Sequence, residues 1–171
     1  MPVRRNDAST IREVFKRAGP AEKIALIISL WFGAGLAPRA KGTFGTLAAV
    51  APVAAIKYLG AASECIFIIV LVSIALWSSH VARNCLERDD PSEVVIDEAA
   101  GFCLSVFLLP FTWIGLCLGF LLFRFFDILK PFPIGMIDRR VKGGAGIVLD
   151  DIVAGIFANI AARIFLIFIG L

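Results

Sequence analysis

The sequence predicts an all-α membrane protein: a compact multi-pass helical bundle with a re-entrant Gly-rich element and a polar site that faces the cytoplasm. Apolar residues make up 59% of the 171 residues and charged residues only 18%, against about 45–50% and about 25% in an ordinary soluble domain. The mean hydropathy is +0.88. A water-facing fold of this size could not bury so much apolar surface, so lipid must be the second solvent.

Apolar runs alternate with charged segments along the chain. Residues 1–23 are polar, with a break at Gly19-Pro20, and are expected to form an amphipathic cytoplasmic segment. Residues 24–171 are expected to form a single membrane-embedded domain, whose apolar runs are 24–38, 44–60, 61–79, 99–123 and 152–171. The first run has about 15 residues, short of the roughly 20 that a spanning helix needs. It is therefore predicted to dip into the bilayer and return.

The distribution of cations predicts the orientation. Lys and Arg gather before residue 24, at 39–41, and in two segments at 80–98 and 124–151. By the positive-inside rule these segments are cytoplasmic. The run 99–123 is then a tight hairpin bent near Pro110, which places the acids on both sides of it at one membrane face. The alternative is a single kinked span, which would place those acids on opposite sides.

The sequence does not favour nucleic-acid binding, disulfide bonds or a zinc site. The net charge is only +3, and no basic stripe with interleaved aromatic residues is present, so nucleic acid is not an expected partner. The four cysteines form no CxxC pair, and Cys65, Cys103 and Cys117 lie in apolar runs, where a thiol behaves as a small hydrophobe. The sequence indicates neither a disulfide framework nor a zinc site.

The Gly-rich segment 33–46 is the first of three polar clusters beside the apolar runs. Its glycines would let backbone N–H groups approach an anion, next to the positive end of a helix that begins near Thr43. The alternative is a packing interface, because small residues let membrane helices touch. The residues alone leave both interpretations open.

The other two clusters hold the acids. Asp97 and Glu98 enter an apolar helix together, and helix capping explains one such carboxylate better than two. Arg124, Asp127 and Lys130 share one helical face at spacing i, i+3, i+6. The last cluster continues through glycines to the doublet at 150–151, which leads into the final apolar run.

Ionisable groups at membrane depth are costly and mark function by default. Acids from several helices at one membrane face suit Mg²⁺, which prefers oxygen ligands and shares them with a substrate phosphate. Other phosphatase routes fail: His80 is the only histidine, no Cys lies six positions before an Arg, and no DxDx(T/V) motif is present. The residues alone therefore predict metal-assisted chemistry on a phosphorylated lipid.

Four ordered blocks carry a resemblance. They are GxGxxPxxxGTxGTL at 33–47, DPSEVVIDExxG at 90–101, FRxxDxxKPFPI at 123–134, and Asp138-Arg139 followed by GGxGIxxDDxxAG within 138–155. Together they resemble the phosphatidylglycerophosphatase A family. The resemblance implies a Mg²⁺-dependent, multi-pass enzyme of the bacterial inner membrane that hydrolyses phosphatidylglycerophosphate to phosphatidylglycerol and phosphate at the cytoplasmic face.

The family pattern falls on particular residues of this chain. Its acids match Asp97, Glu98, Asp127, Asp138, Asp150 and Asp151, its cations match Arg124, Lys130 and Arg139, and its threonine matches Thr43. Two positions depart from it. Lys41 stands where the family commonly has Pro, and Ala37 stands where a small polar residue is usual. Lys41 is therefore an additional candidate phosphate contact.

These residues define the expected site. The candidate catalytic residues are Asp97, Glu98, Asp127 and Asp151; the candidate Mg²⁺ ligands are the same four with Asp150; the candidate substrate-binding residues are Lys41, Thr43, Arg124, Lys130, Asp138 and Arg139. Water is expected to attack the terminal phosphorus in line, while the Arg and Lys side chains neutralise the phosphoryl oxygens. A covalent route through Thr43 lacks an evident adjacent base.

Two rival functions use similar residues. An alcohol phosphatidyltransferase also gathers acids and Mg²⁺ at the membrane edge, but its DGxxAR…GxxxDxxxD helix is missing from this sequence. A divalent-cation transporter would use the same acids as a permeation site. Phosphate release from the lipid separates these alternatives from the phosphatase.

Overall fold

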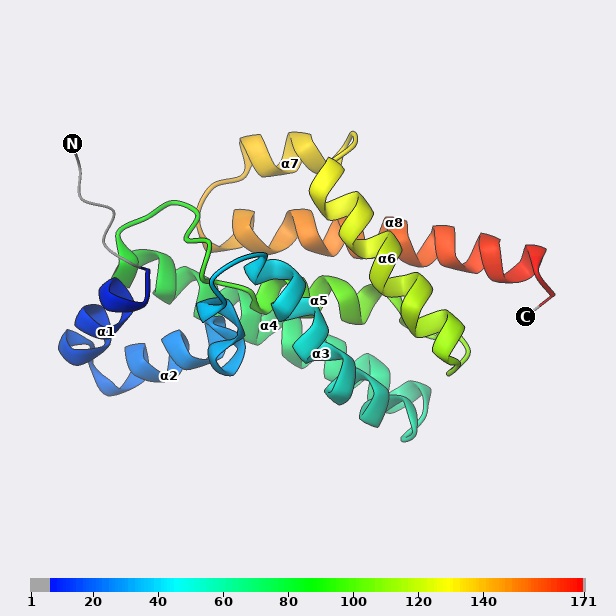
Figure 1. The fold of residues 1–171 in the computed structure, drawn as a ribbon, viewed down its shortest axis with the longest axis horizontal. Coiled ribbons are helices and arrows are strands. Elements are labelled where there is room, and N and C mark those ends of the chain that lie inside the picture. The colour runs from blue at the N-terminus through cyan, green and yellow to red at the C-terminus, as the bar shows by residue number, and fades with distance from the viewer. Residues whose placement is uncertain (1–6, 171) are drawn as a thin grey trace.

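The structure, a computed structural model, describes residues 7–170, and every regular element in that range is a helix (Figure 1). In chain order the helices are α1 (Asp7–Arg17), α2 (Pro20–Ser29), the 3₁₀ segment η1 (Trp31–Leu36), α3 (Lys41–Lys57), α4 (Ala61–Leu86), α5 (Ile96–Ser105), α6 (Trp113–Leu129), α7 (Ile134–Arg140) and α8 (Gly144–Phe168). The prediction of an all-α fold is confirmed for these residues.

The short helix α5 occupies the middle of the bundle (Figure 1). α3, α4, α6 and α8 all pack against it, and Ala99, Phe102 and Cys103 on α5 are buried. α5 has 10 residues, so at 1.5 Å per residue it is about 15 Å long, roughly half the thickness of a hydrocarbon core. It therefore ends inside the bundle and leaves backbone groups there that need partners.

Polar side chains of α8 supply those partners. Asn159 donates hydrogen bonds to the carbonyl oxygens of Ser105 and Phe107, at 3.1 Å and 2.9 Å. Arg163 donates to the Phe107 carbonyl at 2.9 Å. Backbone polar groups away from water must be satisfied within the protein. This requirement explains why an arginine and an asparagine interrupt the last apolar helix.

The apolar run 99–123 is a helical hairpin. It breaks between α5 and α6, where the Thr112 hydroxyl accepts a hydrogen bond from the Gly115 N–H at 3.0 Å and so caps α6. A Cβ at Gly101 would lie 2.4 Å from the Phe123 ring, and one at Gly119 would lie 2.4 Å from Val106. These paired contacts place the two helices antiparallel and in close contact. One continuous kinked helix is excluded.

The N-terminal region divides as predicted at Gly19-Pro20. Gly19 caps α2, and its N–H donates to the Glu22 carboxylate at 2.7 Å. α1 buries Ile11 against the core. Residues 1–6 of the predicted amphipathic segment lie outside the described residues. The location of this segment at a membrane surface stays a prediction.

The first apolar run, 24–38, is also broken. α2 ends at Ser29, and Trp31, Phe32 and Gly33 then adopt positive φ values of 46°, 55° and 103°. These three residues lie inside η1, the segment that leads to α3. The path of this run relative to a bilayer stays a prediction.

The last helix begins earlier than the sequence predicted. The sequence places the acidic doublet at 150–151 at the opening of the last helix, but α8 begins at Gly144, six residues before it. Glycines usually disfavour a helix, which hid this start. Here a Cβ at Gly144 would lie 2.5 Å from the His80 Cα, so close packing against α4 requires a glycine.

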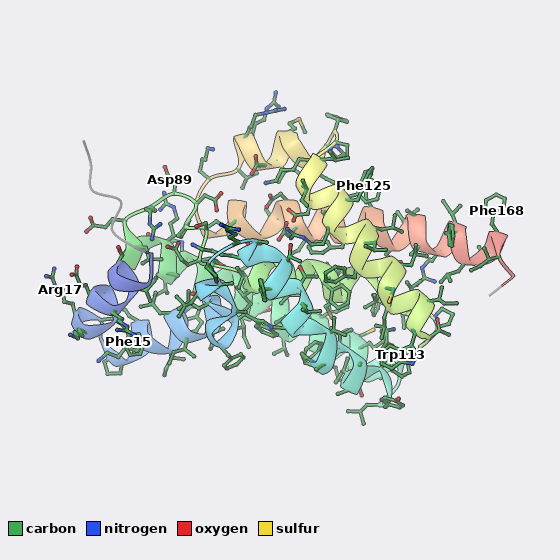
Figure 2. The ribbon with its side chains drawn as sticks, in the orientation of Figure 1. Phe15, Arg17, Asp89, Trp113, Phe125 and Phe168 are labelled. Atoms are coloured by element: carbon green, nitrogen blue, oxygen red, sulfur yellow. The ribbon has the colours of Figure 1, made fainter. Side chains whose placement is uncertain are left out.

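Among the described residues, two helices, α4 and α8, are long and apolar enough to cross a membrane. Outward-facing aliphatic side chains on them include Ile66, Ile69 and Val70 on α4 and Ile160, Ile164 and Ile167 on α8. Arg17 and Asp89 lie toward one end of the molecule, and Trp113 and Phe168 toward the other (Figure 2). This distribution supports membrane association. The number of crossings and the side that the polar end faces stay predictions.

Candidate active site

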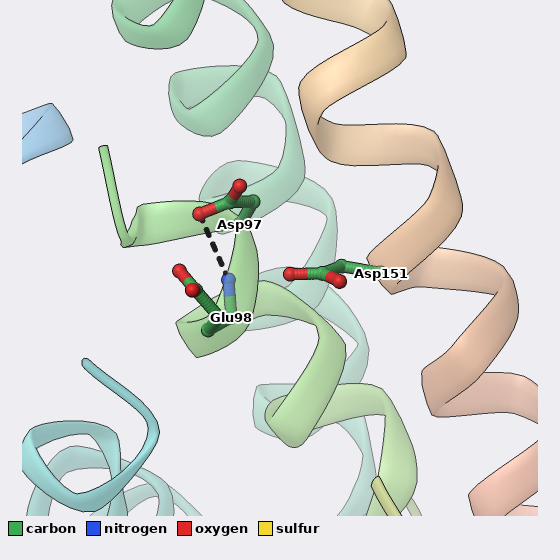
Figure 3. A group of neighbouring side chains, drawn as sticks. All are labelled: Asp97, Glu98 and Asp151. Carbon is green, nitrogen blue, oxygen red and sulfur yellow. Dashed lines mark hydrogen bonds between the residues drawn. The ribbon is translucent and has the colours of Figure 1, made fainter. Parts of the chain in front are cut away.

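Three carboxylates from two helices point toward one another (Figure 3). Asp97 and Glu98 lie in the first turn of α5, and Asp151 lies on α8. One carboxylate oxygen from each lies within 4.8 Å of the others. The Glu98 N–H donates to Asp97 Oδ1 at 3.1 Å, which fixes the Asp97 side chain over the start of the helix.

Two glycines let α5 and α8 come close enough for this convergence. A Cβ at Gly155 would lie 2.3 Å from the Gly101 carbonyl oxygen. One at Gly101 would lie 2.7 Å from the Asp151 carbonyl oxygen. The two backbones therefore touch one turn away from the carboxylates, and this contact sets the position of Asp151 beside α5.

The cluster concentrates negative charge in a buried place. Asp97 is 8% exposed and Asp151 is 3% exposed. Burial, followed by the neighbouring Glu98 and Asp151 carboxylates, raises the pKa of Asp97 well above its ordinary value. Such a group of like charges requires a compensating cation if it is to stay ionised at neutral pH.

Asp127 on α6 extends the cluster and is held by Arg124. The Arg124 guanidinium donates to the Asp127 carboxylate at 2.6 Å, one helical turn away. The Asp127 carboxyl group also adjoins that of Asp151. The predicted helical face of Arg124 and Asp127 is thus present, and it turns Asp127 toward the three converged acids.

Lys130 has carboxylate partners that the sequence did not predict. Its ammonium donates to Asp138 and to Asp150, both at 2.7 Å, and its predicted contact with a substrate phosphate stays a prediction. Burial alone lowers the pKa of Lys130, but the two carboxylates outweigh it and raise that pKa above the ordinary lysine value. Lys130 is therefore a charged link between the end of α6, the short helix α7 and α8.

Lys41 also has partners within the protein. Its ammonium donates to the Ser92 hydroxyl at 3.0 Å and lies 3.9 Å from the Glu93 carboxylate. Arg88 donates to that same carboxylate at 2.9 Å. Lys41 therefore joins the start of α3 to the loop before α5, a contact that the sequence did not predict.

The Gly-rich segment packs closely against the loop and first turn of α5. A Cβ would lie 1.9 Å from the Glu93 carbonyl oxygen at Gly35, 2.2 Å from Glu98 Oε1 at Gly42, and 2.8 Å from the Val95 Cβ at Gly45. Of the two interpretations left open by the sequence, close packing is the one that these contacts support. The packing has a chemical consequence, since Gly42 leaves room for the Glu98 carboxylate.

One pocket of about 740 Å³ collects nearly all the predicted site residues. Those that line it are Lys41, Asp97, Glu98, Arg124, Asp127, Lys130, Asp138, Arg139, Asp150 and Asp151. Thr43 does not line it, so the structure does not place this hydroxyl with the others. The buried acids form the floor of the pocket, and exposed residues of three loops form its mouth.

The sequence analysis overlooked several residues of this region. Arg39, Ser92 and Lys142 also line the pocket. Ser92 lies inside the second sequence block and Arg39 inside the first. Their position among the residues of these blocks could have indicated that they lie near the site. Lys142 lies inside the fourth block, between Asp138-Arg139 and the glycines, and only its position before those glycines could have suggested it.

Comparisons with known proteins fall on the same part of the chain. Residues 27–166 match the family described as Phosphatidylglycerophosphatase A. The chain belongs to the phosphatidylglycerophosphatase A family. Recognition from the four sequence blocks is thereby confirmed, as is the expectation that the chain is an enzyme of the lipid phosphatase class.

Three curated proteins illustrate the relationship. The chain is 35% identical over 133 residues to phosphatidylglycerophosphatase A of Escherichia coli (strain K12), covering 77% of each chain. It is 34% identical over 148 residues to that of Haemophilus influenzae, covering 82% of this chain and 91% of the relative. A Bacteroides thetaiotaomicron protein, provisionally named as a phosphatidylinositol-3-phosphatase, is 32% identical over 80% of this chain and 90% of its own length. No solved structure matches the chain significantly.

Proposed function

We propose that the chain hydrolyses the phosphate monoester of phosphatidylglycerophosphate with the help of Mg²⁺, giving phosphatidylglycerol and phosphate. The observation that carries this proposal is the convergence of Asp97, Glu98 and Asp151 on the floor of one pocket, in a member of the phosphatidylglycerophosphatase A family. Two relatives at 34% and 35% identity bear the name of this activity.

The donor set fits a magnesium ion. All its atoms are carboxylate oxygens, which Mg²⁺ prefers, and the pocket leaves room for the water and phosphate oxygens that complete its coordination. Within residues 7–170, Glu98 Oε2 and Asp150 Oδ1 are buried without a hydrogen-bond partner. Asp97, Glu98 and Asp151 would hold the ion, with Asp127 and Asp150 beside them. When bound, Mg²⁺ polarises a phosphoryl oxygen and favours ionisation of the attacking water.

The protein side chains would orient the substrate and balance its charge. The Arg124 guanidinium lines the pocket beside the acids, where it can donate to an equatorial phosphoryl oxygen as negative charge builds there. Water forms a bond to phosphorus and gives up one proton, the bond from phosphorus to the glycerol oxygen breaks, and that oxygen takes up a proton to become the hydroxyl of phosphatidylglycerol. Lys130 would act by holding Asp150 and Asp138 in place.

We further propose that the chain is a multi-pass protein of the bacterial inner membrane whose pocket opens to the cytoplasm. The apolar faces of α4 and α8 support the membrane location, and the cations around the pocket support its orientation. The acyl chains would then remain among the apolar helices while the headgroup enters the pocket.

The relatives' names also bound the substrate class. Phosphatidylglycerophosphate and a phosphatidylinositol 3-phosphate both carry a phosphodiester next to the diacylglycerol and a separate terminal monoester. A lipid of this two-phosphate class is therefore the proposed substrate. We favour the glycerol headgroup because the two relatives named for it are the more similar ones.

Phosphate release from phosphatidylglycerophosphate in neutral detergent micelles tests the proposal. The purified chain should release inorganic phosphate with Mg²⁺ present, lose this activity in EDTA, and regain it when Mg²⁺ is restored. A phosphatidyltransferase would consume lipid without freeing phosphate, and a cation transporter would leave the lipid unchanged. Either result would replace the phosphatase assignment.

A further inference from the structure

The cations of the pocket fall into two groups. One group is already engaged by side chains of the protein: Arg124 by Asp127, Lys130 by Asp138 and Asp150, and Lys41 by Glu93 and Ser92. Their charges are largely balanced by these carboxylates. A second anionic group on a substrate would have to find its partners elsewhere in the pocket.

Three exposed cations at the mouth form the second group. Arg39 lies in the loop before α3, Arg139 lies at the end of α7, and Lys142 lies in the loop before α8. All three line the same pocket as the carboxylates. None of their side chains has an ion pair or hydrogen bond within residues 7–170. They are thus available to a ligand.

The acids of the mouth do not cancel this charge. Asp89 and Asp90 also line the pocket, but Asp89 is paired with Arg83. Asp90 then remains against three cations, one from the loop before α3 and two from the end of α7 and the loop that follows it. The mouth is therefore cationic over an anionic floor, an arrangement that favours a ligand whose outer part carries its own negative charge.

The size of the pocket agrees with a ligand that has two charged groups. Its volume of about 740 Å³ lies within the range of about 300–1,000 Å³ that holds drug-sized ligands. One phosphate group has five heavy atoms and would fill only a small part of it. A headgroup with an inner and an outer phosphate would extend from floor to mouth.

We propose that Arg39, Arg139 and Lys142 form a second anion subsite that binds the phosphodiester of the lipid while its terminal monoester meets the buried carboxylates. The proposal rests on the function proposed above and adds the reason for its selectivity. A lipid with only a monoester, such as phosphatidic acid, cannot fill both subsites. The mouth would therefore favour substrates in which a phosphodiester precedes the scissile group.

Substitution of two mouth cations tests the subsite without touching the floor. For the Arg39→Gln/Lys142→Gln variant, the ratio of kcat/KM for phosphatidylglycerophosphate to that for phosphatidic acid should fall about tenfold, as charge-assisted hydrogen bonds to the phosphodiester are lost. The loss should appear in KM, because the phosphodiester does not react. Arg140→Gln is the matched control: Arg140 is exposed beside Arg139 but does not line the pocket.

A binding measurement separates this subsite from the proposed activity. Phosphatidylglycerol carries the phosphodiester without the monoester, so short-chain phosphatidylglycerol should bind the wild-type protein through the mouth alone. Calorimetry in a neutral detergent should show its Kd rise about tenfold in the double variant and stay unchanged in Arg140→Gln. If the wild type releases no phosphate from either lipid, the activity proposal fails and this comparison still decides the subsite. An unchanged Kd, or an equal loss of turnover on both lipids, overturns the subsite.

Discussion

Asp97 on α5 and Asp151 on α8 present carboxylate oxygens within 4.8 Å of each other, and both side chains are buried. Mutual repulsion between buried carboxylates opposes folding unless a cation or a proton compensates it. The close backbone contact between Gly101 and Gly155 nevertheless holds them together. The protein therefore maintains an unfavourable charge arrangement at this point, which is expected where a divalent ion and a phosphate are bound.

Replacing Asp97 or Asp151 by Asn should reduce kcat for phosphate release by at least about 10²-fold, since each change removes a charged oxygen ligand. The variants should remain folded. In EDTA their Tm should equal or exceed that of the wild type, because one of the repelling charges is gone. Circular dichroism melting beside the phosphate assay measures both effects.

Glu87→Gln provides the control, since Glu87 is exposed and does not line the pocket. It should keep wild-type kcat. Mg²⁺ at one hundred times its Kd should raise the free energy of unfolding of the wild type and of this control by about 2.7 kcal/mol. Their Tm should rise accordingly, and the Tm of the two Asn variants should not. Near-normal turnover in both Asn variants would remove these residues from the catalytic group.

Gly42→Ala should reduce activity although alanine is the better helix former. The added Cβ would lie 2.2 Å from Glu98 Oε1 and 3.0 Å from the Arg124 guanidinium, so the Glu98 carboxylate must move. A displacement of about 1 Å at a reacting centre can cost up to about 10²-fold in rate. Steady-state kinetics should show that loss in kcat, together with a higher Mg²⁺ requirement.

Stability distinguishes this effect from unfolding. An alanine in α3 should be neutral or stabilising by about 0.5–1 kcal/mol in helix propensity, so the Tm should hardly fall. Gly19→Ala is the matched variant, because its Cβ meets only Glu22 Oε2, at an ordinary 3.7 Å. Full activity in Gly42→Ala would mean that the Glu98 carboxylate can move without consequence.

The role of Gly42 shows how far the sequence could predict this site. Composition and the four blocks identified the acids, because doublets such as Asp97-Glu98 in an apolar helix are costly and stand out. The partners of Lys41 and Lys130 could not be predicted in this way. A cation near a predicted phosphate site suggests a phosphate contact. Only the fold shows that the ammonium groups of Lys41 and Lys130 also contact hydroxyl or carboxylate groups from distant segments.

The fold itself was predictable where apolar runs have clear ends. The hairpin of α5 and α6 followed from Pro110 and from the need to bring acids to one face. The start of α8 did not, because Gly143, Gly144 and Gly146 weaken any helical signal. Gly144 packs against His80, and this is a long-range contact that no local pattern records.

Lys130→Gln should loosen the link between α7 and α8. The change leaves Asp150, which is 5% exposed, without its cation, and this should lower the free energy of unfolding by about 1–3 kcal/mol. We expect kcat/KM to fall roughly tenfold as the pocket loses its shape. Lys130→Arg keeps the charge and should retain more of both quantities.

A double-mutant cycle with Asp138→Asn checks that Lys130 acts through its carboxylate partners. Because the two side chains are in direct contact, their effects on unfolding should be non-additive by about 0.5–3 kcal/mol. Denaturant titration of the four proteins measures this coupling. Additive effects would show that the link contributes nothing to the folded state.

Single cysteines at positions 62, 112 and 142, in a background without the four native cysteines, should reveal the membrane topology. Ala62 lies in the first turn of α4 and Thr112 caps α6. The Tyr58 and Phe111 rings, from the connections just before these two helices, pack at a centroid distance of 4.7 Å. These two connections must therefore share one side. Lys142 lines the pocket, near the C-terminal end of α6 and the N-terminal end of α8.

A membrane-impermeant maleimide should label positions 62 and 112 in intact cells, and position 142 only after the membrane is opened, because loops rich in cations face the cytoplasm. Labelling of 112 and 142 from the same side would contradict the spanning of α6 and, with it, the placement of the pocket at the cytoplasmic face.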